Sequence, residues 1–190
     1  MFGRKQTVVR KWKMILVSHT HWDREWYLPF QQFRANLVGA VDGLLELMTS
    51  DDTYRYFMLD GQTVVLEDYL EVRPDREEEL RRLIQSGRIL IGPWYVMPDE
   101  FLVSGESLIR NLLEGRRTAA KFGPVMDVGY VPDPFGHIAQ LPQLLRGFGI
   151  DSAILWRGVG GHLRYDEAFW EAPDGSQVLL EYMPRGYANA

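Results

Sequence analysis

Short apolar runs and longer amphipathic segments alternate along this chain of 190 residues. The apolar runs cover residues 14–17, 57–59, 89–91, 128–131, 153–156 and 178–182. Such an alternation is typical of a parallel β-sheet whose strands are joined by crossover helices. We therefore expect six strands, arranged either as an open doubly wound α/β sheet or as a β/α barrel.

Four segments between or beside these runs carry apolar side chains at helical spacing. In the first, apolar residues recur at steps of three and four from Phe33 to Met48, which marks one face of a helix. The second is entered through Pro74 and closed by Gly87, as helix ends often are. The second, third and fourth helices are expected around residues 80–84, 108–120 and 142–148.

Composition excludes several classes of protein. Hydrophobic residues make up 46% and charged residues 25%, as in a globular protein with a real core. The net charge of −5 gives no electrostatic reason to bind a phosphate backbone, so we expect no nucleic acid partner. The absence of cysteine excludes disulfides, thiolate metal sites and a cysteine nucleophile. Any metal must therefore be held by histidine and carboxylate side chains.

The two ends of the sequence bear on its location and extent. The amino-terminal residues 1–13 are basic, but the apolar run at 14–17 is too short for a signal-peptide core or a membrane span. We expect a cytoplasmic protein with no membrane partner, and the sequence leaves its oligomeric state open, a homo-oligomer included. The last strand is followed only by residues 183–190. Because a barrel needs more strands, we expect the sequence to be a fragment of a longer protein.

Polar side chains follow five of the expected strands. These are His19, His21 and Asp23 after the first, Asp60 and Gln62 after the second, Asp99 and Glu100 beyond the third, Asp133 and His137 after the fourth, and Arg157 after the fifth. In both candidate architectures the active site lies at the carboxyl ends of the strands. The sequence therefore predicts a shared functional rim.

His19, His21 and Asp23 alternate along an extended segment, so their side chains point to one side. Imidazole and carboxylate groups suit Zn²⁺ at about 2.0–2.2 Å. The same spacing also fits a hydrogen-bonded loop, or a pair of histidines in which one only orients the other.

Asp133 lies between Pro132 and Pro134, which stiffen the backbone on both sides. This frame suits a carboxylate that must be held still, and it suits a plain turn equally well. Arg157 follows Trp156 in an apolar run, where an unpaired charge is costly. We expect Arg157 to meet a carboxylate, a bound anion or a hydroxyl group.

Two further signals are less specific. The adjacent acidic residues Asp99 and Glu100 are expected in a solvated loop. Aromatic residues make up 13% of the chain, which fits the apolar platforms of sugar-binding clefts or ordinary core packing.

Four motifs, in order, resemble the amino-terminal domain of glycoside hydrolase family 38, the zinc-dependent retaining α-mannosidases. They are His19-Thr20-His21-Trp22-Asp23-Arg24-Glu25-Trp26-Tyr27, Leu59-Asp60-Gly61-Gln62, Gly92-Pro93-Trp94-Tyr95 and Asp133-Pro134-Phe135-Gly136-His137. The likeness is to the bacterial branch that also contains hydrolases of mannosylglycerate and its 6-phosphate. Eukaryotic members have Asn-Asp-Pro-Gly where this chain has Trp22-Asp23-Arg24-Glu25, so their detailed substrate contacts are not carried over.

The resemblance implies a parallel seven-stranded β/α barrel, with residues 1–190 forming its first part and helical and β-sandwich domains following. It implies that His21 and Asp23 are zinc ligands and that Asp133 is both a zinc ligand and the catalytic nucleophile. The family's fourth ligand, a histidine, and its general acid/base, an aspartate, come from further along the chain, beyond Ala190.

The implied reaction is hydrolysis of terminal α-mannosidic bonds with retention of configuration, through a mannosyl ester of Asp133. Trp26 would stack on the sugar, Phe135 would line its site, and Arg157 would hold the nucleophile or a sugar hydroxyl. The remaining rim candidates are His19, Asp99 and His137. Two alternatives stay open: a barrel metallohydrolase such as a carbohydrate deacetylase or amidohydrolase, and a fragment that is inactive by itself.

Overall fold

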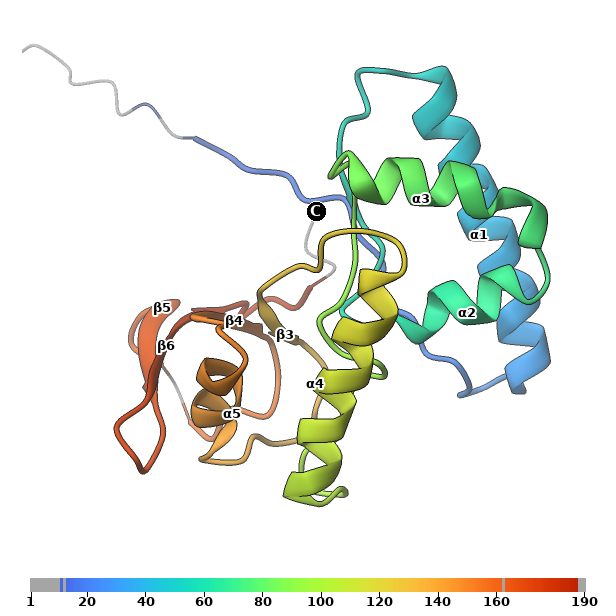
Figure 1. Cartoon of the computed structure of the whole chain (residues 1–190). Helices are drawn as coiled ribbons and strands as arrows, with labels where there is room; N and C mark the ends of the chain where they lie inside the picture. Colours follow the sequence, from blue (N-terminus) through green and yellow to red (C-terminus); the bar gives the residue numbers. More distant parts are fainter. Residues whose placement is uncertain (1–10, 12, 162, 188–190) are drawn as a thin grey trace, which may run out of the picture.

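A computed structural model of the chain describes residues 11, 13–161 and 163–187; most of the basic amino-terminal segment lies outside these residues. Helices α1, α2 and α3 gather at one end of the molecule, strands β3 to β6 with α5 at the other, and α4 lies between them (Figure 1). The helices are α1 (Phe30–Ser50), α2 (Val64–Leu70), the 3-10 helix η1 (Pro74–Arg76), α3 (Glu77–Gln85), α4 (Gly105–Ala120) and α5 (Leu141–Gly147).

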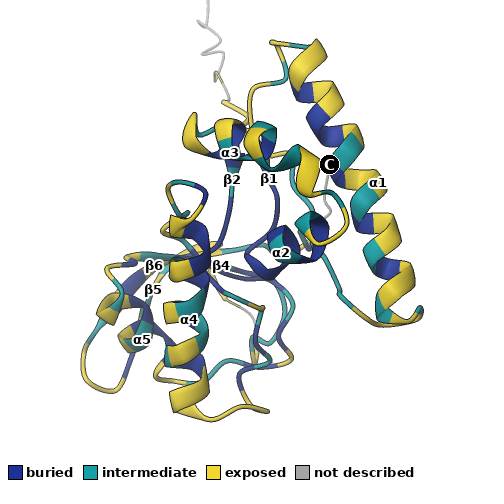
Figure 2. Cartoon of the chain, turned by 45° about the vertical axis from the view of Figure 1, so that its right-hand side comes forward, coloured by how far each residue is buried: buried dark blue, intermediate teal, exposed yellow. Residues whose placement is uncertain are grey.

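The expected helical periodicities are confirmed. In α1 the buried side chains recur at steps of three and four, from Phe33 to Met48. Figure 2 shows these dark-blue patches of α1 on the side toward α2 and α3. Each leucine buried in this way stabilises the fold by about 1.5–3 kcal/mol. At the start of α4 the Ser104 hydroxyl accepts a hydrogen bond from the Ser107 amide at 3.2 Å, a normal helix cap. Helix α2 is an element that the sequence patterns did not indicate.

The described strands form two sheets rather than a closed barrel. Strands β1 (Phe57–Met58) and β2 (Ile89–Leu90) pair in parallel. Strands β3 (Gly129–Val131), β4 (Ser152–Leu155), β5 (Glu167–Glu171) and β6 (Gln177–Tyr182) form the second sheet in the order β3-β4-β6-β5. The sheets are joined where the Trp94 indole donates to the Tyr130 carbonyl oxygen at 3.1 Å and the Met126 amide donates to Ile91 at 2.8 Å.

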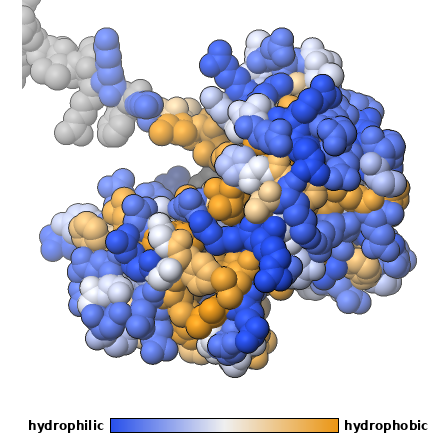
Figure 3. Space-filling view, viewed as in Figure 1, coloured by the Kyte–Doolittle hydropathy of each residue, from blue (hydrophilic) through white to orange (hydrophobic). Residues whose placement is uncertain are grey.

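Two expectations about the strands are wrong. Residues 14–17 form no strand, and their side chains are largely exposed, because backbone pairing begins only at Ser18 and Thr20, which bond to Met58. In Figure 3 an orange stretch lies where residues 14–17 run in Figure 1. The sheet is also not wholly parallel, since β5 runs antiparallel to β6 as a hairpin. The hydrophobic pattern does not predict strand β5, because exposed and half-buried residues alternate along it and form no apolar run.

Two clusters of buried side chains form the core. One joins α1, α2 and α3 with β2, and the other joins α4, α5 and the second sheet around Trp94. The strands that lie between the two clusters end on the same side of the molecule. The polar side chains that follow these strands therefore lie close together.

Gly115 is where α4 packs against the segment after β2, and a side chain is not tolerated there. A Cβ atom would overlap the Pro93 carbonyl oxygen and the backbone of Trp94 and Tyr95. We expect Gly115→Ala to lower the free energy of unfolding by about 3 kcal/mol or more, because packed backbone must separate. Gly43→Ala is the matched control at an exposed position of helix α1, where an added Cβ atom would meet nothing within 4 Å, and it should stabilise by about 0.5–1 kcal/mol. Denaturant unfolding of both variants checks this, and equal stabilities would contradict the packing.

Candidate active site

The ends of the parallel strands converge on a cleft of about 430 Å³. Its lining includes residues from the segments that follow Ser18, β1, β2 and β3, namely His21, Asp23, Gln62, Met97, Asp99, Asp133 and Phe135. A larger open cleft of about 1470 Å³ shares His21 and Asp23 and extends past Trp26. Part of the expected functional rim therefore lines two adjoining clefts, whereas Asp60, Glu100, His137 and Arg157 line neither.

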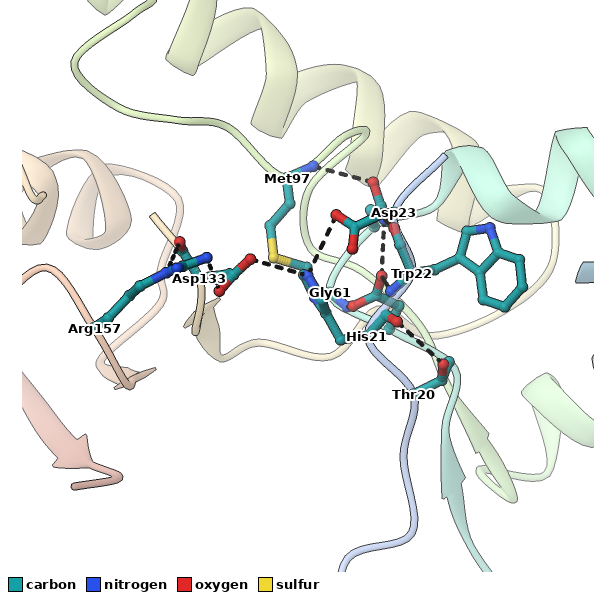
Figure 4. A network of polar contacts seen from close by, with 10 residues as sticks. Thr20, His21, Trp22, Asp23, Gly61, Met97, Asp133 and Arg157 are labelled. Carbon is teal, nitrogen blue, oxygen red and sulfur yellow. Dashed lines mark hydrogen bonds and ion pairs between the residues drawn. The ribbon is translucent and has the colours of Figure 1, made fainter. Parts of the chain in front are cut away.

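Three of the candidate ligands meet at the centre of this rim. The Nε2 atom of His21 lies 3.4 Å from a carboxylate oxygen of Asp133 and 3.7 Å from one of Asp23. One donor atom from each residue lies within 4.8 Å of the other two. Figure 4 shows Asp133 between Arg157 on one side and the segment of His21 and Asp23 on the other. Residues more than a hundred positions apart in the sequence thus share one site.

These donor atoms fit a zinc ion. Both ring nitrogens of His21 are buried and have no hydrogen-bond partner among the described residues. Two ligands at about 2.0–2.2 Å from a tetrahedral Zn²⁺ ion lie about 3.3–3.6 Å apart, close to the observed separations. Such spacings are too long for hydrogen bonds and natural for ligands that share a cation. His21, Asp23 and Asp133 could therefore hold Zn²⁺ and leave room for further ligands.

A buried clamp holds the backbone between the first two of these ligands. The Asp60 carboxylate accepts a hydrogen bond from the Trp22 amide at 3.0 Å, and the Gln62 side-chain amide donates to the Trp22 carbonyl oxygen at 2.5 Å. The same amide of Gln62 donates to Asp60 at 2.8 Å. Burial raises the pKa of Asp60 to about 6, although the charge of His21 opposes the shift. Because hydrogen bonds hold both the amide and the carbonyl group of Trp22, its neighbours His21 and Asp23 have a fixed backbone orientation.

An ion pair holds the residue that follows Asp23. The Arg24 guanidinium donates to both carboxylate oxygens of the buried Asp68, at 2.6 and 2.9 Å. This hydrogen bonding with Asp68 raises the pKa of Arg24. Glu25 then lines the cleft.

Arg157 has Asp133 as its carboxylate partner. Its Nε atom donates to the Asp133 backbone carbonyl oxygen at 2.7 Å, and its terminal nitrogen forms an ion pair with the Asp133 carboxylate. The guanidinium also lies 4.4 Å from the centre of the Phe135 ring, within the range of a cation–π contact. Asp133 is therefore held through both its backbone and its side chain.

The other candidates lie in different places. Trp26 and Phe135 are 73% and 76% exposed, so both rings are accessible to a ligand. Asp99 lines the cleft. His19 and His137 stay outside the group of His21, Asp23 and Asp133: His19 contacts the Tyr187 carbonyl oxygen at 2.7 Å, and His137 contacts Glu100 and Arg157.

The expectation of a solvated loop is wrong for Glu100, which is only 1% exposed. Its carboxylate accepts hydrogen bonds from His137 and from a backbone amide, and these contacts offset the cost of burial. No signal in the sequence separates Glu100 from the exposed acidic residues. Asp60 and Gln62, by contrast, directly follow an expected strand, and that position alone predicts that they lie at the rim.

The buried pair of Glu100 and His137 should make stability depend on pH. Burial disfavours the charged imidazole, but the hydrogen bond and charge of Glu100, with Asp99 nearby, raise the pKa of His137 above 6.5. The pair therefore contributes stability fully below about pH 6.5, and this contribution is lost as the pH rises through the raised pKa. Melting temperatures of the wild type and Glu100→Gln should differ most below about pH 6.5 and converge as the pH rises through the raised pKa of His137. A constant difference would contradict this assignment.

Comparisons with known proteins agree with the geometry. The model of the Glycosyl hydrolases family 38 N-terminal domain matches residues 11–190. The "Putative mannosylglycerate hydrolase" of Halalkalibacterium halodurans is 46% identical over 187 residues, which cover 92% of this chain and 21% of that protein. The alpha-mannosidase of Saccharomyces cerevisiae is 31% identical, over 90% of this chain and 16% of its own.

Solved structures give the same result. The chain resembles the crystal structure of an alpha-mannosidase from Enterococcus faecalis V583, with a TM-score of 0.88 and 40% identity. That match covers 90% of this chain and 20% of the other. The chain thus spans about a fifth of the length of these bacterial relatives. Within the described residues, every helix is too short or too polar to cross a membrane.

Proposed function

Since the chain belongs to glycosyl hydrolase family 38, we propose that the complete protein that carries it hydrolyses terminal α-mannosidic bonds with retention of configuration. We assign residues 1–190 to the amino-terminal part of its catalytic barrel. The observation that carries the proposal is the meeting of His21, Asp23 and Asp133 at distances that suit a shared cation. The cytoplasmic location and the oligomeric state stay predictions.

Asp133 is the nucleophile in this proposal. One of its carboxylate oxygens forms a bond to the anomeric carbon of mannose as the bond to the leaving-group oxygen breaks, and that oxygen takes a proton from the general acid. Water then displaces the Asp133 ester, which restores the original configuration at the anomeric carbon. Arg157 supports this role, because its contacts with the carbonyl and carboxylate of Asp133 fix the direction from which the attack comes.

The other residues bind and orient. His21 and Asp23 would hold zinc together with Asp133, and Zn²⁺, when bound, would act as a Lewis acid that chelates the sugar hydroxyls and favours a flattened ring. The exposed rings of Trp26 and Phe135 are suited to pack on the apolar face of the sugar. The name of the Halalkalibacterium relative supports a small mannoside, such as mannosylglycerate, as one substrate to test.

The proposal is tested with an activated fluoro-mannoside, which slows the second step and lets the covalent enzyme accumulate. Mass spectrometry of the complete protein should locate the sugar on the peptide that contains Asp133. Hydrolysis of substrate with no covalent label would instead indicate a metallohydrolase that activates water, such as a carbohydrate deacetylase. A label on another residue would also contradict the assignment.

A further inference from the structure

Glu100 lies in the loop between β2 and α4, is buried, and has both of its carboxylate oxygens engaged. Oε1 lies 2.8 Å from Nδ1 of His137, and Oε2 accepts a hydrogen bond from the Ile138 amide at 2.8 Å. The side chains of Glu100 and His137 are 0% and 6% exposed. A fully desolvated pair of this kind is costly to bury and often contributes little net stability. Because the pair is connected through Arg157 to the candidate nucleophile Asp133, its position suits a role in addition to its pH-dependent contribution to stability.

His137 also contacts the backbone of Arg157. Its Nε2 atom lies 2.9 Å from the Arg157 carbonyl oxygen. A carbonyl oxygen and a carboxylate both accept hydrogen bonds, so each ring nitrogen of His137 must carry a proton. The ring is therefore an imidazolium that donates to Glu100 on one side and to Arg157 on the other.

Arg157 in turn joins two strand ends. Its amide donates to the Pro132 carbonyl oxygen at 3.2 Å, and its guanidinium binds the carbonyl and carboxylate of Asp133. The next residue, Gly158, has a positive φ of 83°, and a Cβ atom there would lie 2.8 Å from the Pro134 carbonyl oxygen and 2.9 Å from Nε2 of His137. The turn is packed too closely for any other residue, so Arg157 has little freedom once His137 is in place.

We propose that Glu100 and His137 are positioning residues for Asp133, acting through the backbone of Arg157. They fix the guanidinium that holds one oxygen of the Asp133 carboxylate, so that the other oxygen stays on the side of His21. This inference rests on the proposed function, in which Asp133 is the nucleophile. It adds two residues that touch neither the sugar nor the cation.

A matched pair of substitutions at His137 isolates the contact with Arg157. In His137→Gln the amide nitrogen reaches the place of Nε2 and can still donate to Arg157, whereas in His137→Asn it reaches only the place of Nδ1 and keeps the contact with Glu100. In the complete protein we expect His137→Asn to lower kcat and the rate of labelling of Asp133 by about 10-fold to 100-fold. His137→Gln should stay within about threefold of the wild type, and KM should change by less than about threefold in both variants, because the substrate contacts are retained.

Three controls separate positioning from general stability. Zinc content measured at saturating zinc should match the wild type in both variants, since His21 and Asp23 keep their contacts, so that a loss of kcat is not a loss of metal. Tyr69→Phe removes a partly buried hydrogen bond, from the hydroxyl of Tyr69 in the other core cluster to Asp42 at 2.7 Å. It should lower the melting temperature without lowering kcat. Glu100→Ala should lower kcat as His137→Asn does, and the two changes together should do little more than either alone.

The outcomes are distinct. A wild type that carries no label on Asp133 overturns the proposed function, and this inference with it. A labelled wild type whose His137→Asn and His137→Gln variants share the same kcat and labelling rate overturns only the positioning role. Should Glu100→Ala fail to fold, the matched pair at His137 decides the question.

Discussion

Replacing Asp133 by asparagine in the complete protein is expected to abolish turnover of an activated mannoside, lowering kcat by roughly 10⁴-fold or more. The amide is nearly isosteric with the carboxylate, but it is a poor nucleophile and a weak zinc ligand. The fold should persist, since Asp133 is partly exposed and the bond from Arg157 to its backbone carbonyl oxygen is unaffected by the change. Steady-state kinetics and thermal unfolding together measure both effects.

Asp127→Asn is the matched control for this variant. Asp127 lies shortly before β3, carries an ion pair with Arg116 and is 54% exposed. It should retain wild-type kcat, because exposed ion pairs contribute little and the site is not touched. If Asp133→Asn instead kept its activity, or unfolded at a much lower temperature while Asp127→Asn did not, Asp133 would have a structural role.

Replacing His21 by alanine is expected to remove zinc from the purified protein. Loss of a direct ligand should weaken zinc binding by more than the roughly 10-fold to 100-fold seen when an outer partner of a ligand is removed. Metal analysis after dialysis should then find close to one zinc per wild-type molecule and almost none in the variant. Activity should fall in parallel and should not return on addition of equimolar zinc.

His19→Ala serves as the control for this experiment. His19 is two positions away on the same extended segment, but its Nε2 atom contacts the Tyr187 carbonyl oxygen rather than the group around His21. This variant should therefore keep its zinc. An equal loss of metal from both variants, or from neither, would remove His21 from its assigned role as a ligand.

The parts of the fold that could be predicted from sequence are those in which a local pattern reports burial. The face of α1 is an example, because the apolar side chains from Phe33 to Met48 recur at helical spacing and are buried. Residues 14–17 show the limit of this reasoning. An apolar run indicates that a segment is suited to burial, but its burial depends on neighbours that the run does not identify.

The candidate site divides in the same way. A rule of topology, that the carboxyl ends of parallel strands converge, predicts a shared rim that includes His21, Asp23 and Asp133. The choice of these three as ligands came from the family resemblance. The same rule includes Glu100 among the rim candidates but does not predict its burial, since it lies ten residues beyond β2 in a loop. Glu100 is buried through contacts with His137 and Ile138. Because these residues are far from Glu100 in the sequence, the residues around Glu100 do not predict the contacts.

The account rests on a single divalent cation held jointly by His21, Asp23 and Asp133. The most direct test is a crystal structure of the complete protein with diffraction data collected on both sides of the zinc absorption edge. An anomalous peak about 2.0–2.2 Å from Nε2 of His21 and from carboxylate oxygens of Asp23 and Asp133 is the predicted result. A zinc peak held by other residues, with these three side chains turned away from it, would contradict the account.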